Sequence, residues 1–197
     1  MTPSQALRQQ CGEIDIYLFD QLARGRLDGR TRILDAGCGA GRNLPFFLAH
    51  GFEVHAIDAD AQAIAAVERQ WPGIDARRGE LDRMPWEAGS MDAVIASAVL
   101  HFARDEAHFD AMVQELWRVL RPNGLFFARL ASSIGIEPWL GGATTGRMRL
   151  PDGSARFVVD EAMLLAMTDR LGGTLLDPLK TTNVQNQRAM TTWVMGK

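Results

Sequence analysis

A carboxylate followed by three glycines at alternate positions is the feature of this sequence with the clearest chemical meaning. Residues 33–43 read ILDAGCGAGRN, so Asp35 precedes Gly37, Gly39 and Gly41. Glycine permits a sharp turn with positive φ, and it lets a ligand approach backbone atoms that a Cβ would otherwise cover. The segment therefore predicts a loop that makes close backbone contact with a bound small molecule.

The same segment indicates the kind of ligand. A dinucleotide-binding loop reads G-x-G-x-x-G and holds a pyrophosphate over the start of the next helix. Here the third glycine comes one position early, Arg42 stands in place of the last glycine, and Asp35 would lie close to the phosphate. These residues argue against NAD and favour a ligand with an ammonium group, which a carboxylate holds directly or through water by a charge-assisted hydrogen bond.

Two further acids follow at positions that suit a nucleoside. Asp58 ends an apolar run at about the distance from the glycine loop at which a Rossmann-like site places its acceptor for ribose hydroxyls. Glu80 comes after the next expected strand, where it would accept a hydrogen bond from an adenine amino group. Leu81 and Met84 would contact the ring.

Short apolar runs alternate with helix-period segments in the way that a parallel sheet with crossover helices requires. After one amphipathic helix at residues 4–26, we expect strands at 32–36, 53–57, 73–78, 91–96 and 125–130, and helices at 41–50, 60–70, 104–120 and 160–171. Segments 174–181 and 188–195 predict an antiparallel pair at the sheet edge. The fold class is therefore α/β: a Rossmann-like doubly wound sheet, mostly parallel with an antiparallel C-terminal edge strand, with helices on both faces.

Residues 131–159 break the alternation. They are rich in Gly, Ser, Thr, Pro and Arg, and GGATTG at residues 141–146 is the loosest part. Long irregular connections in compact domains are commonly functional, so we expect a loop or lid on the substrate side here. We interpret residues 1–197 as a single domain, with residues 1–26 as an N-terminal helix or lid.

Composition narrows the function classes. The chain has 197 residues, 47% of them hydrophobic, and a formal net charge of -3, so it lacks the basic excess expected of a nucleic-acid binder. Cys11 and Cys38 show no metal-ligand spacing, and we expect reduced thiols and no bound metal. Because neither a secretory signal nor a membrane span is visible, we expect a cytoplasmic protein with no membrane partner.

The ordered motifs resemble those of class I S-adenosylmethionine-dependent methyltransferases, above all the compact enzymes that act on small molecules. The resemblance covers residues 33 to about 130. The GRN at residues 41–43 and the short length are also similar to tellurite-resistance-type methyltransferases. The motifs are ILDAGCGAGRN, HAIDAD, GELDRMPW, SMDAVIASAVLHF and ELWRVLRPNGLFF.

The resemblance implies a role for each matching residue. Asp35, Gly37, Cys38, Gly39 and Asn43 would surround the methionine part of S-adenosyl-L-methionine. Further along the chain, Asp58 with Ala59 would hold the ribose, Glu80 and Leu81 the adenine, and the Ser97 backbone would lie beneath the ammonium group. The resemblance places His101 at the mouth of the site.

For each of several side chains, two roles stay open. His101 is either a general base or a helix-start residue, and Arg129 either binds an anionic substrate or forms a buried ion pair. Tyr17 and Trp139 are pocket walls or simply core. Arg147, in the irregular segment with Arg149 and Arg156, is solvated or attracts an acidic substrate.

The resemblance implies transfer of a methyl group to a small-molecule acceptor, with S-adenosyl-L-homocysteine as the second product. Two alternatives stay open: a non-catalytic S-adenosylmethionine-binding or regulatory protein, and an NAD(P) oxidoreductase. The sequence lacks an N-P-P-Y-like tetrad and a Pro-Cys nucleophile, which disfavours nucleic-acid methylation. We expect a monomer or homodimer, and the sequence does not identify the acceptor.

Overall fold

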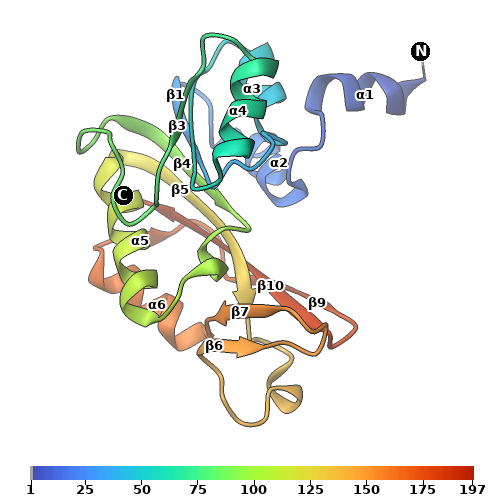
Figure 1. Cartoon of the computed structure of the whole chain (residues 1–197), viewed down its shortest axis with the longest axis vertical. Helices are drawn as coiled ribbons and strands as arrows, with labels where there is room; N and C mark the ends of the chain where they lie inside the picture. Colours follow the sequence, from blue (N-terminus) through green and yellow to red (C-terminus); the bar gives the residue numbers. More distant parts are fainter. Residues whose placement is uncertain (1) are drawn as a thin grey trace.

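The computed structural model describes residues 2–197, and a mixed 8-stranded sheet organises them (Figure 1). The strand order is β3-β2-β1-β4-β5-β10-β8, and β9 also pairs with β10. The first five strands in this order are parallel, and β10 runs antiparallel to β5, β8 and β9. The strands are β1 Arg32–Ala36, β2 Glu53–Asp58, β3 Asp75–Arg78, β4 Met91–Ser97, β5 Leu120–Ser132, β8 Thr174–Leu175, β9 Lys180–Val184 and β10 Arg188–Gly196. The predicted mostly parallel α/β sheet is confirmed.

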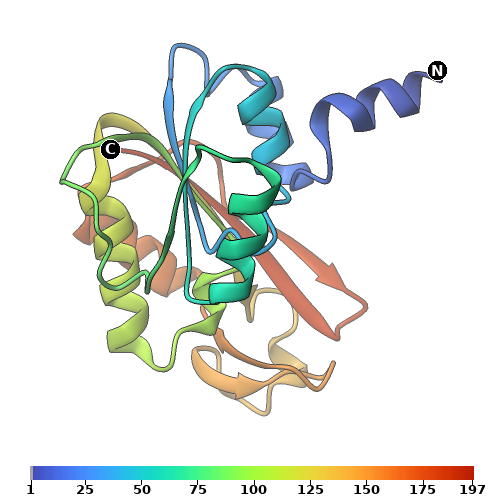
Figure 2. The ribbon, with the colours of Figure 1, turned by 45° about the horizontal axis from the view of Figure 1, so that its top comes forward.

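Helices cover both faces of the sheet, as the two views show (Figures 1 and 2). No helix among residues 2–197 combines the length and apolar character that crossing a bilayer requires. The helices are α1 Pro3–Cys11, α2 Ile16–Ala23, α3 Leu44–Ala49, α4 Ala61–Gln70, α5 Glu106–Val119 and α6 Glu161–Arg170, with short 3-10 turns η1 Leu100–Phe102 and η2 Glu137–Trp139.

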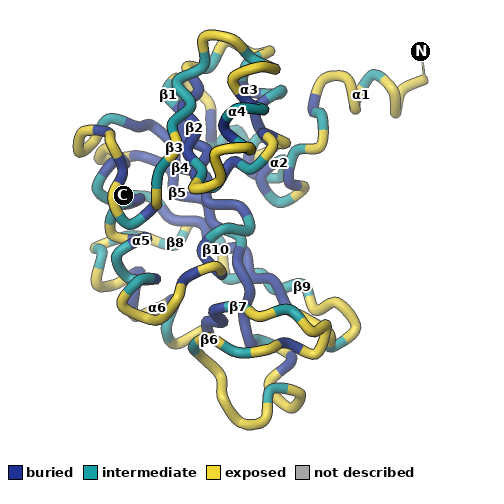
Figure 3. The backbone as a smooth tube through the Cα atoms, in the orientation of Figure 1, coloured by how far each residue is buried: buried dark blue, intermediate teal, exposed yellow. Residues whose placement is uncertain are grey.

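Two apolar layers bury the central strands, because side chains on a strand alternate between the two faces of the sheet. On β1, Leu34 packs into the layer of α5 and α6, while Ile33 packs into the layer of α2, α3 and α4. The strands β1, β4, β5 and β10 are consequently buried along most of their length, whereas α1 is largely exposed (Figure 3). This rigid centre carries the loops that follow each parallel strand.

The N-terminal stretch is two helices, so the predicted single helix at residues 4–26 is wrong. Gly12 has φ +60 and ends α1, and the side chain of Asp15 accepts a hydrogen bond from Tyr17 N and starts α2. A glycine in the left-handed region interrupts a helix even where the apolar spacing continues through it. The helix expected from residue 41 likewise begins only at Leu44, because Gly41 has φ +82.

Residues 131–159 contain more regular structure than we expected. A hairpin of β6 Gly146–Arg149 and β7 Ala155–Val158 forms within this segment, and its Phe157 is fully buried against Phe109 of α5. At the C-terminus, the segment expected at 174–181 divides into β8 and β9, and the two short strands pair antiparallel with different parts of β10. Strand β10 therefore lies inside the sheet and the shorter strands form its edge.

The carboxylate of Asp92 on β4 holds the start of β1 in place by hydrogen bonds. It is 4% exposed and accepts hydrogen bonds from Thr31 N at 2.6 Å and Arg32 N at 3.0 Å, and Arg121 lies 2.9 Å from its other oxygen. Burial alone would raise its pKa, but the hydrogen bonds from Thr31 and Arg32 outweigh burial and lower it. A carboxyl group with a depressed pKa stabilises the fold above its unfolded pKa and loses this effect as the pH falls.

We predict that Asp92→Asn lowers the free energy of unfolding by about 1–3 kcal/mol at neutral pH, because charge-assisted hydrogen bonds are lost. The difference from wild type should shrink as the pH falls through about 4 toward the folded-state pKa. Urea titrations over this pH range measure it. Glu53→Gln, in an exposed ion pair with Arg32, is the control and should cost at most about 1 kcal/mol at neutral pH. Equal losses in both variants would contradict the assignment.

Candidate functional site

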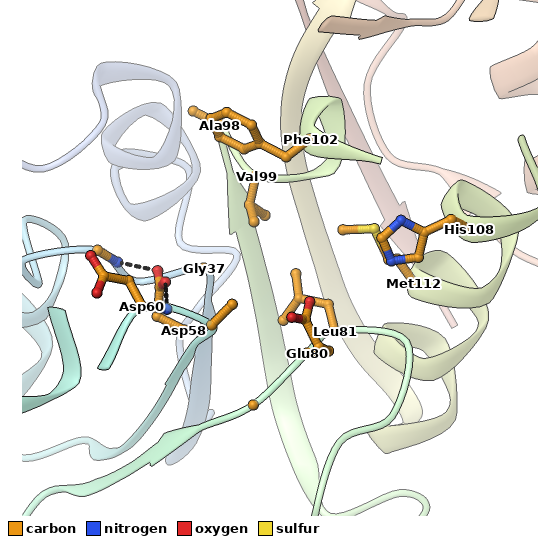
Figure 4. Close-up of a pocket in the computed structure, with 13 residues that line it drawn as sticks. Gly37, Asp58, Asp60, Glu80, Leu81, Ala98, Val99, Phe102, His108 and Met112 are labelled. Carbon is orange, nitrogen blue, oxygen red and sulfur yellow. Dashed lines mark hydrogen bonds between the residues drawn. The ribbon is translucent and has the colours of Figure 1, made fainter. Parts of the chain in front are cut away.

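A cavity of about 430 Å³ opens beside the loops that follow β1, β2 and β4 (Figure 4). In open parallel sheets, ligands bind at this carboxyl-terminal edge. In the close-up, Asp58 and Asp60 lie on one side of the cavity, His108 and Met112 lie on the other, and Glu80 and Leu81 lie between them. The lining residues are Gly37, Gly39, Asp58, Ala59, Asp60, Gly79, Glu80, Leu81, Ala98, Val99, Phe102, His108 and Met112.

Asp58 is held in one orientation by backbone donors. Its Oδ2 accepts a hydrogen bond from Gly39 N at 2.8 Å, and its Oδ1 accepts one from Asp60 N at 2.9 Å. Each carboxylate oxygen keeps further lone pairs for a ligand, because a carboxylate has about four acceptor sites. The loop and the acid are thus fixed to one another beside the cavity.

The three glycines of the loop serve different purposes. A Cβ on Gly37 would lie 2.2 Å from Val99 Cγ2, and one on Gly41 would lie 2.6 Å from a Trp71 ring carbon, so both positions are glycine for packing. Gly39 has φ +53, lines the cavity, and would place a Cβ in open space. Gly39 is therefore the glycine that leaves room for a ligand.

The opposite wall is largely apolar and includes a strained residue. Leu81 is buried and Val99 half-buried, while Phe102 is 54% exposed at the rim. Ala98 has φ +63, a conformation that costs a residue with a Cβ about 1–2 kcal/mol. Such strain clusters at functional sites. Its amide donates to Arg129 O at 2.7 Å, which ties the bend to β5.

Four of the residues expected around the methionine part do not line this cavity. Asp35, Cys38, Asn43 and Ser97 are all buried behind the glycine loop. Asn43 Nδ2 donates to the two oxygens of Asp35 at 3.4 and 3.5 Å, and burial raises the pKa of the Cys38 thiol. The remaining residues expected at the cofactor do come together around the cavity: Gly37, Gly39, Asp58, Ala59, Glu80 and Leu81.

A buried polar network anchored on Asp15 connects these hidden residues. Asp15 is 4% exposed, and its Oδ2 accepts hydrogen bonds from Ser97 Oγ at 2.7 Å and Arg42 at 3.0 Å. Its amide donates to Asn43 Oδ1 at 3.1 Å, and Arg129 lies 3.7 Å from the carboxylate. The side chain of Ser97 thus contacts the N-cap residue of α2, and its sequence motif does not predict this contact.

The carboxylate of Asp35 is deeply buried and accepts only long hydrogen bonds, both from Asn43. Its side chain is 1% exposed, and burial raises its pKa to about 7, while the hydrogen bond from Asn43 and the charge of Arg42 act in the opposite direction. A carboxyl group in this state gains from any cation that approaches it.

His101 lines a second cavity of about 330 Å³ that shares Ala98 and Phe102 with the first. The ring is 6% exposed, and its Nδ1 has no hydrogen-bond partner among the described residues. Burial lowers the pKa of His101 to about 4, and the charges of Arg156, Arg129 and Arg188 add to this effect. The imidazole is therefore neutral at physiological pH.

The substrate-side residues lie in different places. Arg129 lines the second cavity, with its guanidinium 4.9 Å from the ring centre of Tyr17, and it also lies near the buried Asp15. Trp139 is 52% exposed on η2, and Arg147 donates to Ala103 O at 3.1 Å. Neither Trp139 nor Arg147 lines either cavity.

Several residues around both cavities were not predicted from the sequence. Asp15 carries an N-cap signal before an apolar helix, but nothing in the sequence shows that its carboxylate reaches Ser97 from α2. His108 and Met112 lie on α5 and were interpreted only as helix positions. Among residues 2–197, no three His, Cys, Asp or Glu side chains gather in a way that would hold a metal ion.

Comparison with known proteins agrees with this geometry. A sequence model described as a methyltransferase domain matches residues 34–128, the part that contains the glycine loop, Asp58, Glu80 and β4. Residues 34–128 of this chain are thus similar to the methyltransferase domain of class I S-adenosylmethionine-dependent enzymes. The resemblance of its motifs is thereby confirmed, and S-adenosylmethionine is the cofactor of this domain.

Similar proteins carry the same description. A probable S-adenosylmethionine-dependent methyltransferase of Mycolicibacterium smegmatis is 33% identical over 121 residues, which are 61% of this chain and 45% of that protein. A malonyl-[acyl-carrier protein] O-methyltransferase of Enterobacter lignolyticus is 35% identical over 127 residues, covering 63% of this chain and 49% of the relative. The matches thus span about half the length of these curated relatives.

Solved methyltransferase structures share the fold. A SAM-dependent methyltransferase of Methanosarcina mazei superposes with a TM-score of 0.70 at 18% identity, covering 89% of this chain and 96% of that one. A Burkholderia thailandensis 1,6-didemethyltoxoflavin-N1-methyltransferase, solved with S-adenosylhomocysteine, gives a TM-score of 0.64 at 18% identity, covering 98% and 85%.

The residues present fit the chemistry of S-adenosylmethionine. Asp58 offers oriented acceptors to vicinal hydroxyls, Leu81 an apolar surface to a base, and Gly39 open space beside the loop. The cavity volume falls in the range of small-molecule sites, roughly 300–1,000 Å³. These three features are compatible with a nucleoside bound in this cavity.

We predict that Gly37→Ala destabilises the fold by about 2–5 kcal/mol, because left-handed backbone and overlap with Val99 both contribute. Gly29→Ala is a matched control, since Gly29 has the same φ of +70 and nothing lies within 4 Å of the position that a Cβ would take, and it should lose only about 1–2 kcal/mol. Adding Val99→Ala to Gly37→Ala should recover only part of the overlap component in urea unfolding, because the Cβ of residue 99 would still lie 2.5 Å away. If Gly29→Ala and Gly37→Ala lose the same amount, packing is not the reason for Gly37.

We also predict that Asp35→Asn stabilises the ligand-free protein at about pH 8, by about 1 kcal/mol or more. The folded pKa of Asp35 lies above its unfolded value, so the ionised form opposes folding and the difference from wild type should grow between about pH 4 and pH 7. Unfolding titrations at several pH values measure this. The exposed Asp28→Asn controls for removal of one negative charge, and a less stable Asp35→Asn protein at pH 8 would contradict the prediction.

Proposed function

We propose that this chain transfers the methyl group of S-adenosylmethionine to a small-molecule acceptor. The observation that carries the proposal is the carboxylate of Asp58, fixed by two backbone amides beside the open Gly39 position. The names of the similar proteins, including an O-methyltransferase and an N-methyltransferase, support methyl transfer as the reaction. We further propose that nucleic acid is not the acceptor, since the net charge is -3.

The proposed cofactor contacts follow from the site. Asp58 would hold the ribose hydroxyls, and Glu80 and Leu81 would contact the adenine. The carboxyl group of Asp35, which lies behind the loop and is weakly paired, would attract the ammonium group. An ammonium group near Asp35 would favour its ionised form and offset the cost of burial. Binding would then depend on pH through Asp35.

The bound cofactor supplies a sulfonium methyl group, which is already a strong electrophile. Transfer to the acceptor would leave the electron pair of the broken carbon–sulfur bond on sulfur, which gives S-adenosylhomocysteine. The residues of this chain need mainly to orient the acceptor and exclude water, which supplies roughly 7–11 kcal/mol in favourable cases. Ala98 and Phe102 stand where the two cavities meet and would align the reacting groups.

A protonated acceptor also requires a place for its proton. His101 is neutral and its Nδ1 has no partner among residues 2–197, but a pKa lowered to about 4 makes it only a weak base for the proton of an oxygen or nitrogen nucleophile. An acceptor that is already anionic would need no base. In that case His101 would serve only as part of the cavity wall.

We predict that Asp58→Asn weakens S-adenosylhomocysteine binding roughly tenfold to a hundredfold, because one charge-assisted acceptor is replaced by an amide donor. Isothermal titration calorimetry measures the affinity, and thermal unfolding checks that the variant folds. Glu68→Gln, an exposed acid on α4 in the same βαβ unit, should bind like wild type. Equal affinity of all three proteins would remove Asp58 from the site.

A labelled-methyl screen against small-molecule acceptors separates the remaining alternatives. An enzyme yields labelled product, whereas a non-catalytic S-adenosylmethionine-binding protein shows affinity without transfer to any acceptor. Thermal stabilisation by NAD(P) and none by S-adenosylhomocysteine would instead indicate an oxidoreductase.

A further inference from the structure

The second cavity is built from different parts of the chain than the first. Its lining residues come from η1, β5, the β6–β7 hairpin and the β9–β10 hairpin. It shares only Ala98 and Phe102 with the cofactor cavity, so a molecule bound in it lies next to the cofactor. The lining residues are Ala98, His101, Phe102, Arg129, Ala131, Leu150, Asp152, Ser154, Arg156, Val184, Arg188 and Met190.

The charges around this cavity do not balance. Arg129, Arg156 and Arg188 line it, and Asp152 is the acid that faces them. One oxygen of Asp152 accepts hydrogen bonds from Ser154, and its other oxygen lies 3.8 Å from Arg188. Within the described residues, no carboxylate lies within 4 Å of Arg156, so the cavity carries excess positive charge.

Arg129 is also incompletely paired. Its Nε is buried and has no hydrogen-bond partner among the described residues, and its side chain is only 20% exposed. The acid near it is Asp15 at 3.7 Å, and that carboxylate is already bound by Arg42 and Ser97 at shorter distances. A buried guanidinium with an unsatisfied donor is costly unless a ligand completes its contacts.

Arg156 is held in place without being neutralised. Its guanidinium lies 4.9 Å from the ring centre of Phe102, and one of its nitrogens donates to Ala155 O at 2.8 Å. Stacking on an aromatic ring orients the planar donors of arginine while leaving them available to a carboxylate or phosphate. Because Phe102 belongs to both cavities, the charge lies close to the place where methyl transfer would occur.

The rest of the wall is largely apolar. Ala131, Leu150 and Met190 are all buried. A cavity with apolar walls and a few cationic groups selects a small organic acid, because the walls bury its carbon skeleton and the guanidinium groups fix its charged end.

We propose that the methyl acceptor is a small organic anion whose carboxylate or phosphate group is bound by Arg129, Arg156 and Arg188. This inference rests on the proposed methyl transfer, since it names the acceptor class for the same site. The acid group anchors the acceptor in the arginine-lined cavity, and its nucleophilic atom faces the cofactor cavity across Ala98 and Phe102.

The test compares benzoate, phenyl phosphate and the neutral benzamide as probes, with the protein saturated by S-adenosylhomocysteine. Ligand-observed NMR titrations measure the three affinities. We expect benzoate or phenyl phosphate to bind at least tenfold more tightly than benzamide, and this preference to fall at high salt because ions screen the arginines. The ratio of benzoate to phenyl phosphate affinity tells which acid group the cavity prefers.

Substitution of the arginines tests whether the preference for anionic probes arises in this cavity. Arg156→Gln combined with Arg188→Gln should strongly reduce the preference for the anionic probes, with Arg129 still present, and leave S-adenosylhomocysteine affinity unchanged. Arg149→Gln is the matched control, because Arg149 lies on the same hairpin, donates to Gly153 O and does not line the cavity. A single Arg188→Gln, at an exposed position, keeps the test valid if the double variant unfolds, and it should reduce the preference in part.

Each outcome decides the proposal. Benzamide binding as tightly as the anions, no detectable binding of either anion, or an unchanged preference in the arginine variants would overturn it. Failure of the proposed methyl transfer looks different, because no acceptor would then gain label in the labelled-methyl screen, whatever the probes do.

Discussion

The buried carboxylate of Asp15 is the point at which the N-terminal segment, the glycine loop and two central strands are joined. A carboxylate that is 4% exposed requires partners, and Asp15 finds them in Ser97 at the end of β4, Arg42 after the glycine loop, and Arg129 on β5. Removing one partner of a buried ion pair typically costs about 3–5 kcal/mol. The two cavities therefore keep a fixed relation to each other through one acid that lines neither of them.

Much of the fold was predictable because each parallel strand is a short apolar run followed by a helix-period segment. The errors have local causes. Gly12 and Gly41 adopt positive φ, which apolar spacing does not reveal, so helices expected to continue through these glycines break or begin later. The β6–β7 hairpin was missed because its strands are four residues long and are stabilised by the distant contact of Phe157 with Phe109.

The residues of the site likewise divide into those that the sequence predicts and those that it does not. Gly39, Asp58 and Leu81 were predictable because they follow strands whose ends meet at one edge of a parallel sheet. Asp15 and His108 were not, because they belong to helices whose positions depend on tertiary packing, and Arg156 was only one of three candidate arginines in an irregular segment. Gly37 lines the cavity, but the sequence does not reveal that a Cβ on Gly37 would overlap Val99 and that a Cβ on Gly41 would overlap Trp71.

The two cavities are lined by different parts of the chain. The cofactor cavity draws only on residues 37–112, whereas the second cavity takes most of its wall from residues 129–190. A substitution at a residue that lines only the second cavity therefore leaves every side chain of the first cavity in place. Such a division lets a gene lineage diversify toward new compounds while the other half of the molecule stays under separate selection.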